Sequence, residues 1–469
     1  MSRRHWAAGI VLALSLHGLG HAQTIGAGDA AAPLAGCDTD LVRLNQLTGW
    51  QVQWPQELAA LARRPAADRA AALPRWRAAA AGLDADMAAL ERHRRAGTTA
   101  PKAVVQRVLA QIDALVATPA APGLTDPDWR AFLDGELTPK ARAFADYLRT
   151  AYLPAAGETS DLASSETGRR CFEQAAARWT SRSMTSAEIE ATGRTLLARY
   201  RLELQTLEGV EAAAIPATLA HLRDGEGRPA ATREDILRIS RDAIDRAVAA
   251  APAWFDASPA QAPLEVEPIA TALEATLPAG FYAQAAGDEP ARYLINLSRP
   301  SDRRLMAEVI AFHEAVPGHH LAFSTARRPG TFNSGFVEGW AIYAEHLADE
   351  MGLYGGREDR LGMVAKHLWA ASRLIVEPGL HVHGWTRDEA VAFLLENTAL
   401  SRAEIEVEVD RYLAMPGQSL AYMIGYETLR AARERTEAAQ GAAFDIRAFH
   451  GRVLAPGSRP LDQLAAEFP

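Results

Sequence analysis

Residues 311–320 read Ala311-Phe312-His313-Glu314-Ala315-Val316-Pro317-Gly318-His319-His320. One glutamate and three histidines therefore lie within eight residues of an apolar run, a combination that suggests a metal site. In the usual zinc-hydrolase signature, His-Glu-x-x-His, two histidines one helical turn apart hold the ion and the glutamate between them polarises its water. Here the second and third histidines follow His313 by six and seven positions. On an ideal helix neither of them can share a metal with His313.

Pro317 and Gly318 lie in this gap and change the expectation. Proline removes a helical donor and clashes with the preceding turn, while glycine accepts unusual dihedral angles, so we expect the helix to bulge by two residues. Such a bulge makes His319 equivalent to the usual second histidine. His320 remains the alternative ligand.

Glu338 is the candidate third ligand. It lies in the run Gly335-Phe336-Val337-Glu338-Gly339-Trp340-Ala341, which we expect to begin a second helix, and eighteen residues separate it from His319. Two histidines and a carboxylate from a following helix can hold zinc and leave one position open for water. The spacing resembles that of the aminopeptidase N-like zinc peptidases. Glu345, two turns further on, either orients a liganding histidine or is a surface charge.

Composition excludes several classes of partner. The 469-residue chain has a formal net charge of -9 and a 48% hydrophobic content, with a pI near 5.9. The acidic balance argues against nucleic acid or an anionic membrane as the main partner. The apolar fraction is ample for a large core.

The first 22 residues have the form of a signal peptide, with Arg3 and Arg4 before an apolar run and a small-residue cleavage site. We therefore expect a periplasmic or secreted protein without stable membrane association after cleavage. Residues 34–37 are similar to a lipoprotein acylation site but lie about twenty residues beyond the apolar run, so we interpret them as coincidental. In an oxidising compartment, Cys37 and Cys171 are expected to form a disulfide; the alternative is two free thiols.

The expected fold is mainly α, with two lobes and a small β element next to the metal-binding helix. Helical periodicity extends from about residue 38 to residue 250, with capping boxes at Thr185 and Thr232, and residues 23–255 are predicted to form a scaffold lobe. Residues 256–469 are predicted to form the catalytic lobe.

Two extended segments precede the histidine cluster, around residues 264–267 and 291–297. A strand beside a hydrolytic metal can bind an extended peptide by edge pairing. This places Tyr293 and Asn296 among the candidate substrate-binding residues. The alternative is a two-stranded structural ribbon.

Residues 378–385 are predicted to form a loop whose histidines, His381 and His383, are candidate substrate contacts, although a lone loop histidine is more often structural. Thr386 is expected to cap the helix that follows. A tyrosine hydroxyl beside the metal is a common donor to the oxyanion of the tetrahedral intermediate. Tyr422 is the first candidate for this role, with Tyr412 and Tyr426 behind it.

Four motifs together resemble the bacterial family called domain of unknown function 885. They lie at residues 313–320, 335–343, 379–386 and 411–422. The resemblance implies a mostly helical, peptidase-like metalloprotein, often exported and similar to the thimet oligopeptidase and angiotensin-converting-enzyme group.

The hypothesis is an exported metallopeptidase that binds one Zn(II) ion through His313, His319 and Glu338. Glu314 would act as the general base toward a peptide substrate. The alternatives are a metal-dependent hydrolase of non-peptide amides or esters and a catalytically inactive binding or scaffold protein.

Overall fold

A computed structural model describes residues 37, 44–47, 49–117, 121–225, 230–256, 262–269, 274, 279–285, 290–327 and 330–468. The predicted signal segment, residues 1–22, lies outside this part of the chain. The protein is mainly α-helical with one small sheet, as expected. Among the helices of the described residues, none combines the length and apolar character needed to span a lipid bilayer.

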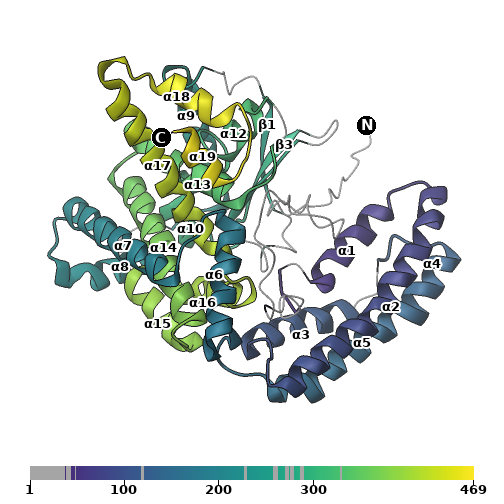
Figure 1. Cartoon of the computed structure of the whole chain (residues 1–469). Helices are drawn as coiled ribbons and strands as arrows, with labels where there is room; N and C mark the ends of the chain where they lie inside the picture. Colours follow the sequence, from purple (N-terminus) through teal and green to yellow (C-terminus); the bar gives the residue numbers. More distant parts are fainter. Residues whose placement is uncertain are drawn as a thin grey trace.

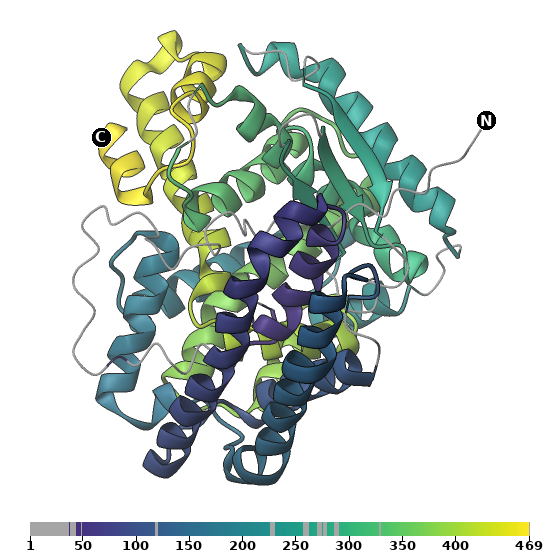
Figure 2. The ribbon, with the colours of Figure 1, turned by 90° about the vertical axis from the view of Figure 1, so that its right-hand side faces the viewer.

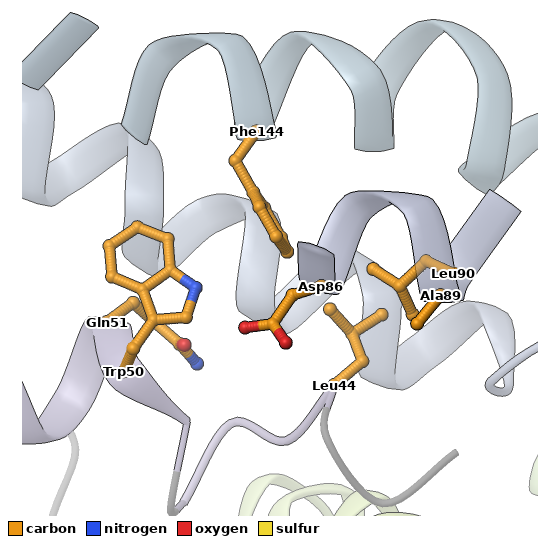
Figure 3. Close-up of a pocket in the computed structure, with 7 residues that line it drawn as sticks. All are labelled: Leu44, Trp50, Gln51, Asp86, Ala89, Leu90 and Phe144. Carbon is orange, nitrogen blue, oxygen red and sulfur yellow. The ribbon is translucent and has the colours of Figure 1, made fainter. Parts of the chain in front are cut away.

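The first five helices form an elongated arm to one side of the remaining helices (Figures 1 and 2). Trp76 and Trp129 pack edge to face in the arm's own core. A small cavity of about 20 Å³ lies against α1, α2 and α5 (Figure 3), and none of its lining residues belongs to the motifs above. The arm comprises α1 (Trp50–Leu61), α2 (Ala66–Ala96), α3 (Lys102–Ala117), α4 (Pro127–Phe132) and α5 (Thr138–Tyr147).

The remaining helices form the body of the protein. The predicted capping boxes at Thr185, Thr232 and Thr386 are all present, and each satisfies backbone N–H groups at a helix start. The helices before the sheet are α6 (Glu166–Thr180), α7 (Ser186–Glu208), α8 (Ile215–Asp224) and α9 (Arg233–Ala250). Those after the sheet are α10 (Pro300–Arg303), α11 (Ala307–Glu314), α12 (His319–Thr325), α13 (Ser334–Glu350), α14 (Arg357–His381), α15 (Arg387–Asn397), α16 (Arg402–Ala414), α17 (Ala421–Gln440), α18 (Ile446–Leu454) and α19 (Leu461–Glu467).

Helices from both sides of residue 255 pack together. Helix α7 lies along α14, α9 lies against α11, and α6 contacts α13 and α17. One hydrophobic cluster joins buried residues of the arm and the body, from Val104 in α3 to Leu464 in α19. The division into two lobes at residue 255 stays a prediction.

Three strands form the sheet: β1 (Leu264–Pro268), β2 (Gly280–Ala283) and β3 (Ala291–Ile295). Both expected extended segments are confirmed, but the two-stranded ribbon is wrong because β2 joins them in the order β1-β3-β2. Strand β1 runs parallel to β3 and β2 antiparallel to it. Consequently β3 is the central strand, and its two edges are already paired.

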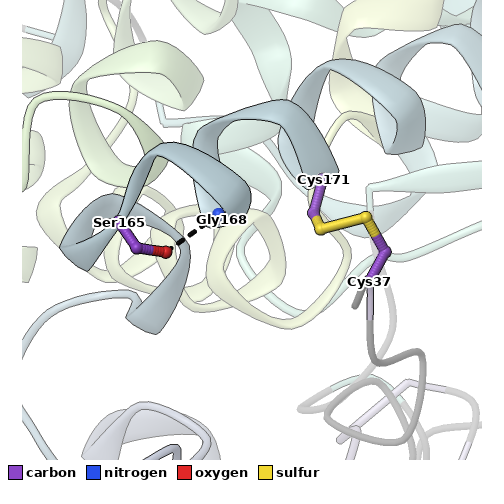
Figure 4. Close-up of a disulfide and its surroundings, with 4 residues drawn as sticks. All are labelled: Cys37, Ser165, Gly168 and Cys171. Atoms are coloured by element: carbon purple, nitrogen blue, oxygen red, sulfur yellow. Dashed lines mark hydrogen bonds between the residues drawn. A yellow bond between two sulfur atoms is a disulfide. The ribbon is translucent and has the colours of Figure 1, made fainter. Parts of the chain in front are cut away.

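The disulfide between Cys37 and Cys171 is present (Figure 4). It links the start of the described chain to α6, whose first turn is capped by the Ser165 hydroxyl accepting from the Gly168 N–H. This confirms the predicted pairing.

Candidate metal centre

The histidine stretch is interrupted between its first and second histidines. Helix α11 ends at Glu314, the Val316–Pro317 peptide bond is cis, and α12 begins at His319. A Cβ on Gly318 would lie 1.9 Å from the carbonyl oxygen of His313, so only glycine fits where the chain turns back over α11. The sequence predicts a bulge within one helix, whereas the structure has two helices joined by a tight connection. Both arrangements bring His319 back toward His313.

Helix α13 brings the carboxylate of Glu338 to the two histidines. Its first turn is capped by Asn333, whose side chain accepts a hydrogen bond from the Phe336 N–H. Gly339 of α13 faces Gly425 of α17 so closely that a Cβ on Gly339 would lie 2.4 Å from the Gly425 backbone. The close approach places the first turns of α17 beside Glu338.

His313, His319 and Glu338 form a compact, buried group. One nitrogen or oxygen from each lies within 4.8 Å of the others. Glu338 Oε2 is 3.4 Å from His313 Nε2 and 3.8 Å from His319 Nε2. Glu314 faces the same group, with its Oε2 4.0 Å from His319 Nε2. Two imidazoles and a carboxylate at such separations are a typical zinc ligand set.

Burial controls protonation in this group. It lowers the pKa of His319 to about 3, aided by the charge of His313, so His319 is neutral and its lone pair is available to a metal. Burial also raises the pKa of Glu314 to about 7, close to the value that suits a general base at neutral pH. For Glu338, burial raises the pKa, but His313 and His319 outweigh burial and hold it below its ordinary value.

Glu345 orients His313. The Nδ1–H group of His313 donates to Glu345 Oε1 at 2.6 Å, which leaves Nε2 directed at Glu338. Lys366 and His367 of α14 also contact this carboxylate, the latter through a 2.8 Å hydrogen bond from Nε2. Glu345 is fully buried, so of the two readings of this residue the surface charge is wrong.

His320 points away from the group. Its Nε2–H donates to the carbonyl oxygen of Ala262 at 3.2 Å, and its Nδ1 lies 3.4 Å from the hydroxyl of Tyr282. The geometry therefore places His319, rather than the alternative His320, beside His313 and Glu338.

Tyr422, in the first turn of α17, lies over the other face of the site. Its ring stacks on His313, with a centroid distance of 6.2 Å and an interplanar angle of 15°. Burial raises the pKa of Tyr422, and the Glu338 charge raises it further, so the phenol keeps its proton and is a hydrogen-bond donor. Of the other tyrosines considered, Tyr412 is bonded to Glu408 and Arg373, and Tyr426 stacks on His346.

The two candidate substrate residues near β3 are inside the protein. Tyr293 is 1% exposed and Asn296 is fully buried. The Asn296 amide donates to the carbonyl oxygen of Glu274 and accepts from the Ser298 N–H. Because β3 is central, it offers no free edge to a peptide. The prediction of edge pairing at residues 291–297 is wrong.

The loop predicted at residues 378–385 is also wrong in its first half, because α14 continues to His381. His381 is fully buried: its Nε2–H donates to the carbonyl oxygen of Tyr412 and its Nδ1 accepts from the Ser160 hydroxyl. His383 is half-exposed and bonds Glu190 on α7. Neither histidine belongs to the group of His313, His319 and Glu338, and His381 exposes no atom to a substrate.

Sequence reasoning did not select three buried residues of α14 that lie near the site: Lys366, His367 and Arg373. All three are nine-tenths or more buried. They lie between apolar residues of a long helix, and a charged side chain in such a helix must find a partner. That pattern is the signal by which they can be recognised.

The fold and site together define a mainly α-helical protein with a buried group of two histidines and a glutamate. The chain belongs to the family described as "Bacterial protein of unknown function (DUF885)", whose match extends over residues 15–468. A comparison with curated protein sequences gives no match.

Two solved structures share the fold. The first is a "putative lipoprotein" from Colwellia psychrerythraea, 22% identical, with a TM-score of 0.79 over 91% of this chain and 80% of that chain. The second is a "putative lipoprotein of unknown function" from Shewanella oneidensis, 19% identical, with a TM-score of 0.70 over 92% of this chain and 83% of that chain. At these identities the likeness concerns the fold alone.

Proposed function

We propose that this protein is a zinc-dependent metallopeptidase. The observation that carries the proposal is the buried group of His313, His319 and Glu338 with Glu314 beside it. The residues fit a metal because Glu338 Oε2 is buried and accepts no hydrogen bond from any described residue. A buried carboxylate oxygen without a donor is costly, and a cation between the three side chains would remove that cost.

Each residue has a distinct part in the proposed reaction. His313, His319 and Glu338 would hold one zinc ion, which would supply a Lewis acid and a water of lowered pKa. Glu314 would accept a proton from the attacking water and return it to the leaving amine. The Tyr422 hydroxyl donates a hydrogen bond to the oxyanion. Glu345 keeps His313 in the tautomer and orientation that direct its Nε2 toward Glu338, where it would be available as a ligand.

Strand β2 supports a peptide as the substrate. The Asn296 N–H donates to the carbonyl oxygen of Ala279, so the antiparallel alternation turns the backbone groups of Gly280 and Tyr282 away from β3. No described strand pairs with that edge. The Tyr282 backbone lies close enough to Glu314 to favour its ionised form. An extended peptide on this edge would pass the proposed base.

Export to the cell envelope is part of the proposal. The predicted signal segment supports it, and the two structural neighbours are named as lipoproteins. In this chain the sulfur of Cys37 is bonded to Cys171, so it is not free to carry a lipid. We therefore propose a periplasmic or secreted protein rather than one anchored at Cys37.

The test is metal content together with hydrolysis of a mixed peptide library, for the wild type and for Glu314→Gln. We expect one zinc per chain in both proteins and a loss of turnover of about 10²- to 10⁴-fold in the variant. Glu338→Gln should lose zinc as well. Wild-type protein that binds no zinc and hydrolyses no peptide when zinc is added would overturn the proposal. If only non-peptide amides or esters are cleaved, the proposed site stands and the proposed substrate class is wrong.

A further inference from the structure

Arg373 lies at the end of a stack that leads to the metal centre. Its guanidinium carbon is 4.0 Å from the ring centre of Trp369 and 4.5 Å from that of Tyr422. The ring of Tyr422 in turn stacks on His313. A guanidinium held between two aromatic faces keeps its N–H groups at its edge, where they can donate to a planar acceptor.

The hydrogen bonds of Arg373 leave one end of this edge open. Nε donates to the Tyr412 hydroxyl at 3.2 Å and Nη2 to Glu408 Oε2 at 3.3 Å. Within the described residues, Nη1 has no hydrogen-bond acceptor. The protein does not enclose this atom completely, so it stays accessible to solvent. The residue as a whole is 3% exposed. Nη1 is therefore reachable from outside the protein and can donate to an acceptor that a substrate supplies.

The charge around Arg373 favours an anion at that position. Arg373 and Arg411 share the carboxylate of Glu408. The nearby carboxylate of Glu377 is engaged by the N–H groups of Gly417 and Ser419 and by the Ser419 hydroxyl. Burial raises the pKa of Glu377 to about 7, so its negative charge is only partly present at neutral pH. The two arginines thus share one fully charged carboxylate, that of Glu408, and only part of the charge of Glu377.

We propose that Arg373 binds a free carboxylate of the substrate, and that this protein removes short pieces from the carboxyl end of peptides. The inference rests on the proposed peptidase function. The ring centre of Tyr422 lies 6.2 Å from that of His313, and the guanidinium carbon of Arg373 lies 4.5 Å from the Tyr422 ring centre. The guanidinium is therefore within about 11 Å of the His313 ring, which is the length of about three residues of extended chain. A carboxylate held at Arg373 thus places a bond within about three residues of the carboxyl end at the metal centre.

A wild-type experiment tests this without any substitution. The zinc-loaded protein is given acetyl-Ala-Ala-Phe-Ala-Ala with a free carboxylate, the same peptide as its carboxyl-terminal amide, and an amidated peptide with one glutamate in place of the last alanine. A charge-assisted hydrogen bond gives an expected preference of about 10- to 100-fold in kcat/KM for the free acid over the plain amide. Equal rates for these two peptides would overturn the inference. If the amidated glutamate peptide is cleaved with the kcat/KM of the free acid, an acidic side chain is an equivalent source of the carboxylate.

Substitutions then locate the preference. Arg373→Gln should reduce the preference for the free acid, measured as the ratio of kcat/KM for the two peptides in the same variant, to less than about threefold, because one charge-assisted bond is removed. Arg373→Lys should keep part of the preference, since it retains charge but not the planar edge. The control is Arg360→Gln on the same helix, where an arginine pairs with Asp349 near the surface. A variant that loses activity on both peptides to the same degree points to a structural role and contradicts the inference.

Binding separates failure of this inference from failure of the proposed function. Calorimetry with Glu314→Gln protein measures the affinity for the free acid and for the amide without any turnover. If no peptide is hydrolysed but the free acid binds more tightly, and Arg373→Gln removes that difference, the carboxylate site stands and the peptidase proposal fails. If peptides are hydrolysed but neither affinity nor rate depends on the carboxylate, the peptidase proposal stands alone.

Discussion

His319 and His320 are adjacent in sequence but differ in what their imidazoles contact. His319 Nε2 lies 3.8 Å from Glu338, whereas His320 bonds the Ala262 carbonyl. We therefore predict that His319→Ala weakens zinc binding by at least about 100-fold, since it removes a ligand rather than a supporting hydrogen bond. His320→Ala is the matched control and should retain zinc. Competition with a chelator measures both affinities. Zinc loss on substituting His320 but not His319 would reverse the assignment.

His381 provides a pH-dependent contribution to stability away from the metal group. Burial lowers its pKa to about 4 in the folded protein, against an ordinary value near 6.5. Between these values the unfolded chain binds a proton that the folded chain does not. The free energy of unfolding therefore falls as the pH drops from about 6.5 to about 4, by about 3 kcal/mol from this residue.

Replacement of His381 should flatten that dependence. We predict that His381→Gln is less stable than the wild type at pH 7, because buried hydrogen bonds to Ser160 and Tyr412 are disturbed. The difference between the two proteins should shrink toward pH 4. Urea unfolding at several pH values measures it. Other buried histidines titrate equally in both proteins. Parallel plots of the free energy of unfolding against pH for the two proteins would therefore refute the role of His381.

At the scale of elements, the connection between α11 and α12 determines whether the two histidines meet. Gly318→Ala would place a Cβ 1.9 Å from the His313 carbonyl oxygen, so the backbone must shift. We predict a loss of stability of about 1–3 kcal/mol together with weaker zinc binding. Gly82→Ala is the control, because nothing lies within 4 Å of a Cβ there. It should be neutral or slightly stabilising, since α2 gains a better helix former. Thermal unfolding and zinc content distinguish the two outcomes.

Helix starts could be predicted from the sequence because their cause is local. The Thr185, Thr232 and Thr386 caps each bond a residue three positions on, and all three are present. The end of α14 was missed for the opposite reason. Pro378 and Gly379 have the local character of a break, but the ring of Trp385 packs against Gly379, and burial of the last turn keeps it helical.

The same distinction, between features set by local sequence and features set by packing, holds for the site. His313, His319 and Glu338 could be selected because ligand spacing is a property of the sequence, and the structure brings them within 4.8 Å. The central position of β3 could not be predicted, because it depends on β2, which lies between the two expected strands in the chain but pairs at the far side of β3. Strand order is set by packing rather than by local pattern.

At the scale of the whole molecule, the site draws its parts from well-separated segments. The proposed ligands come from α11, α12 and α13 and the proposed oxyanion donor from α17. Polar partners of Glu345 come from α14. Helix α6 contacts both α13 and α17 and also carries Cys171. The disulfide therefore ties the start of the described chain to a helix that packs against α13 and α17, which carry Glu338 and Tyr422.

The last prediction concerns this disulfide, which closes a sequence separation of 134 residues. A loop of this size restricts the unfolded chain strongly, so removing the bridge is expected to lower the free energy of unfolding by about 2–5 kcal/mol. Cys37→Ser with Cys171→Ser should show this loss, while reducing agent should lower the stability of the wild type and leave the variant unchanged. Thiol titration of the denatured, unreduced wild type should find no free thiol. Two free thiols would contradict the pairing. One thiol and a lipid on Cys37 would contradict both the pairing and the proposal of an unanchored protein.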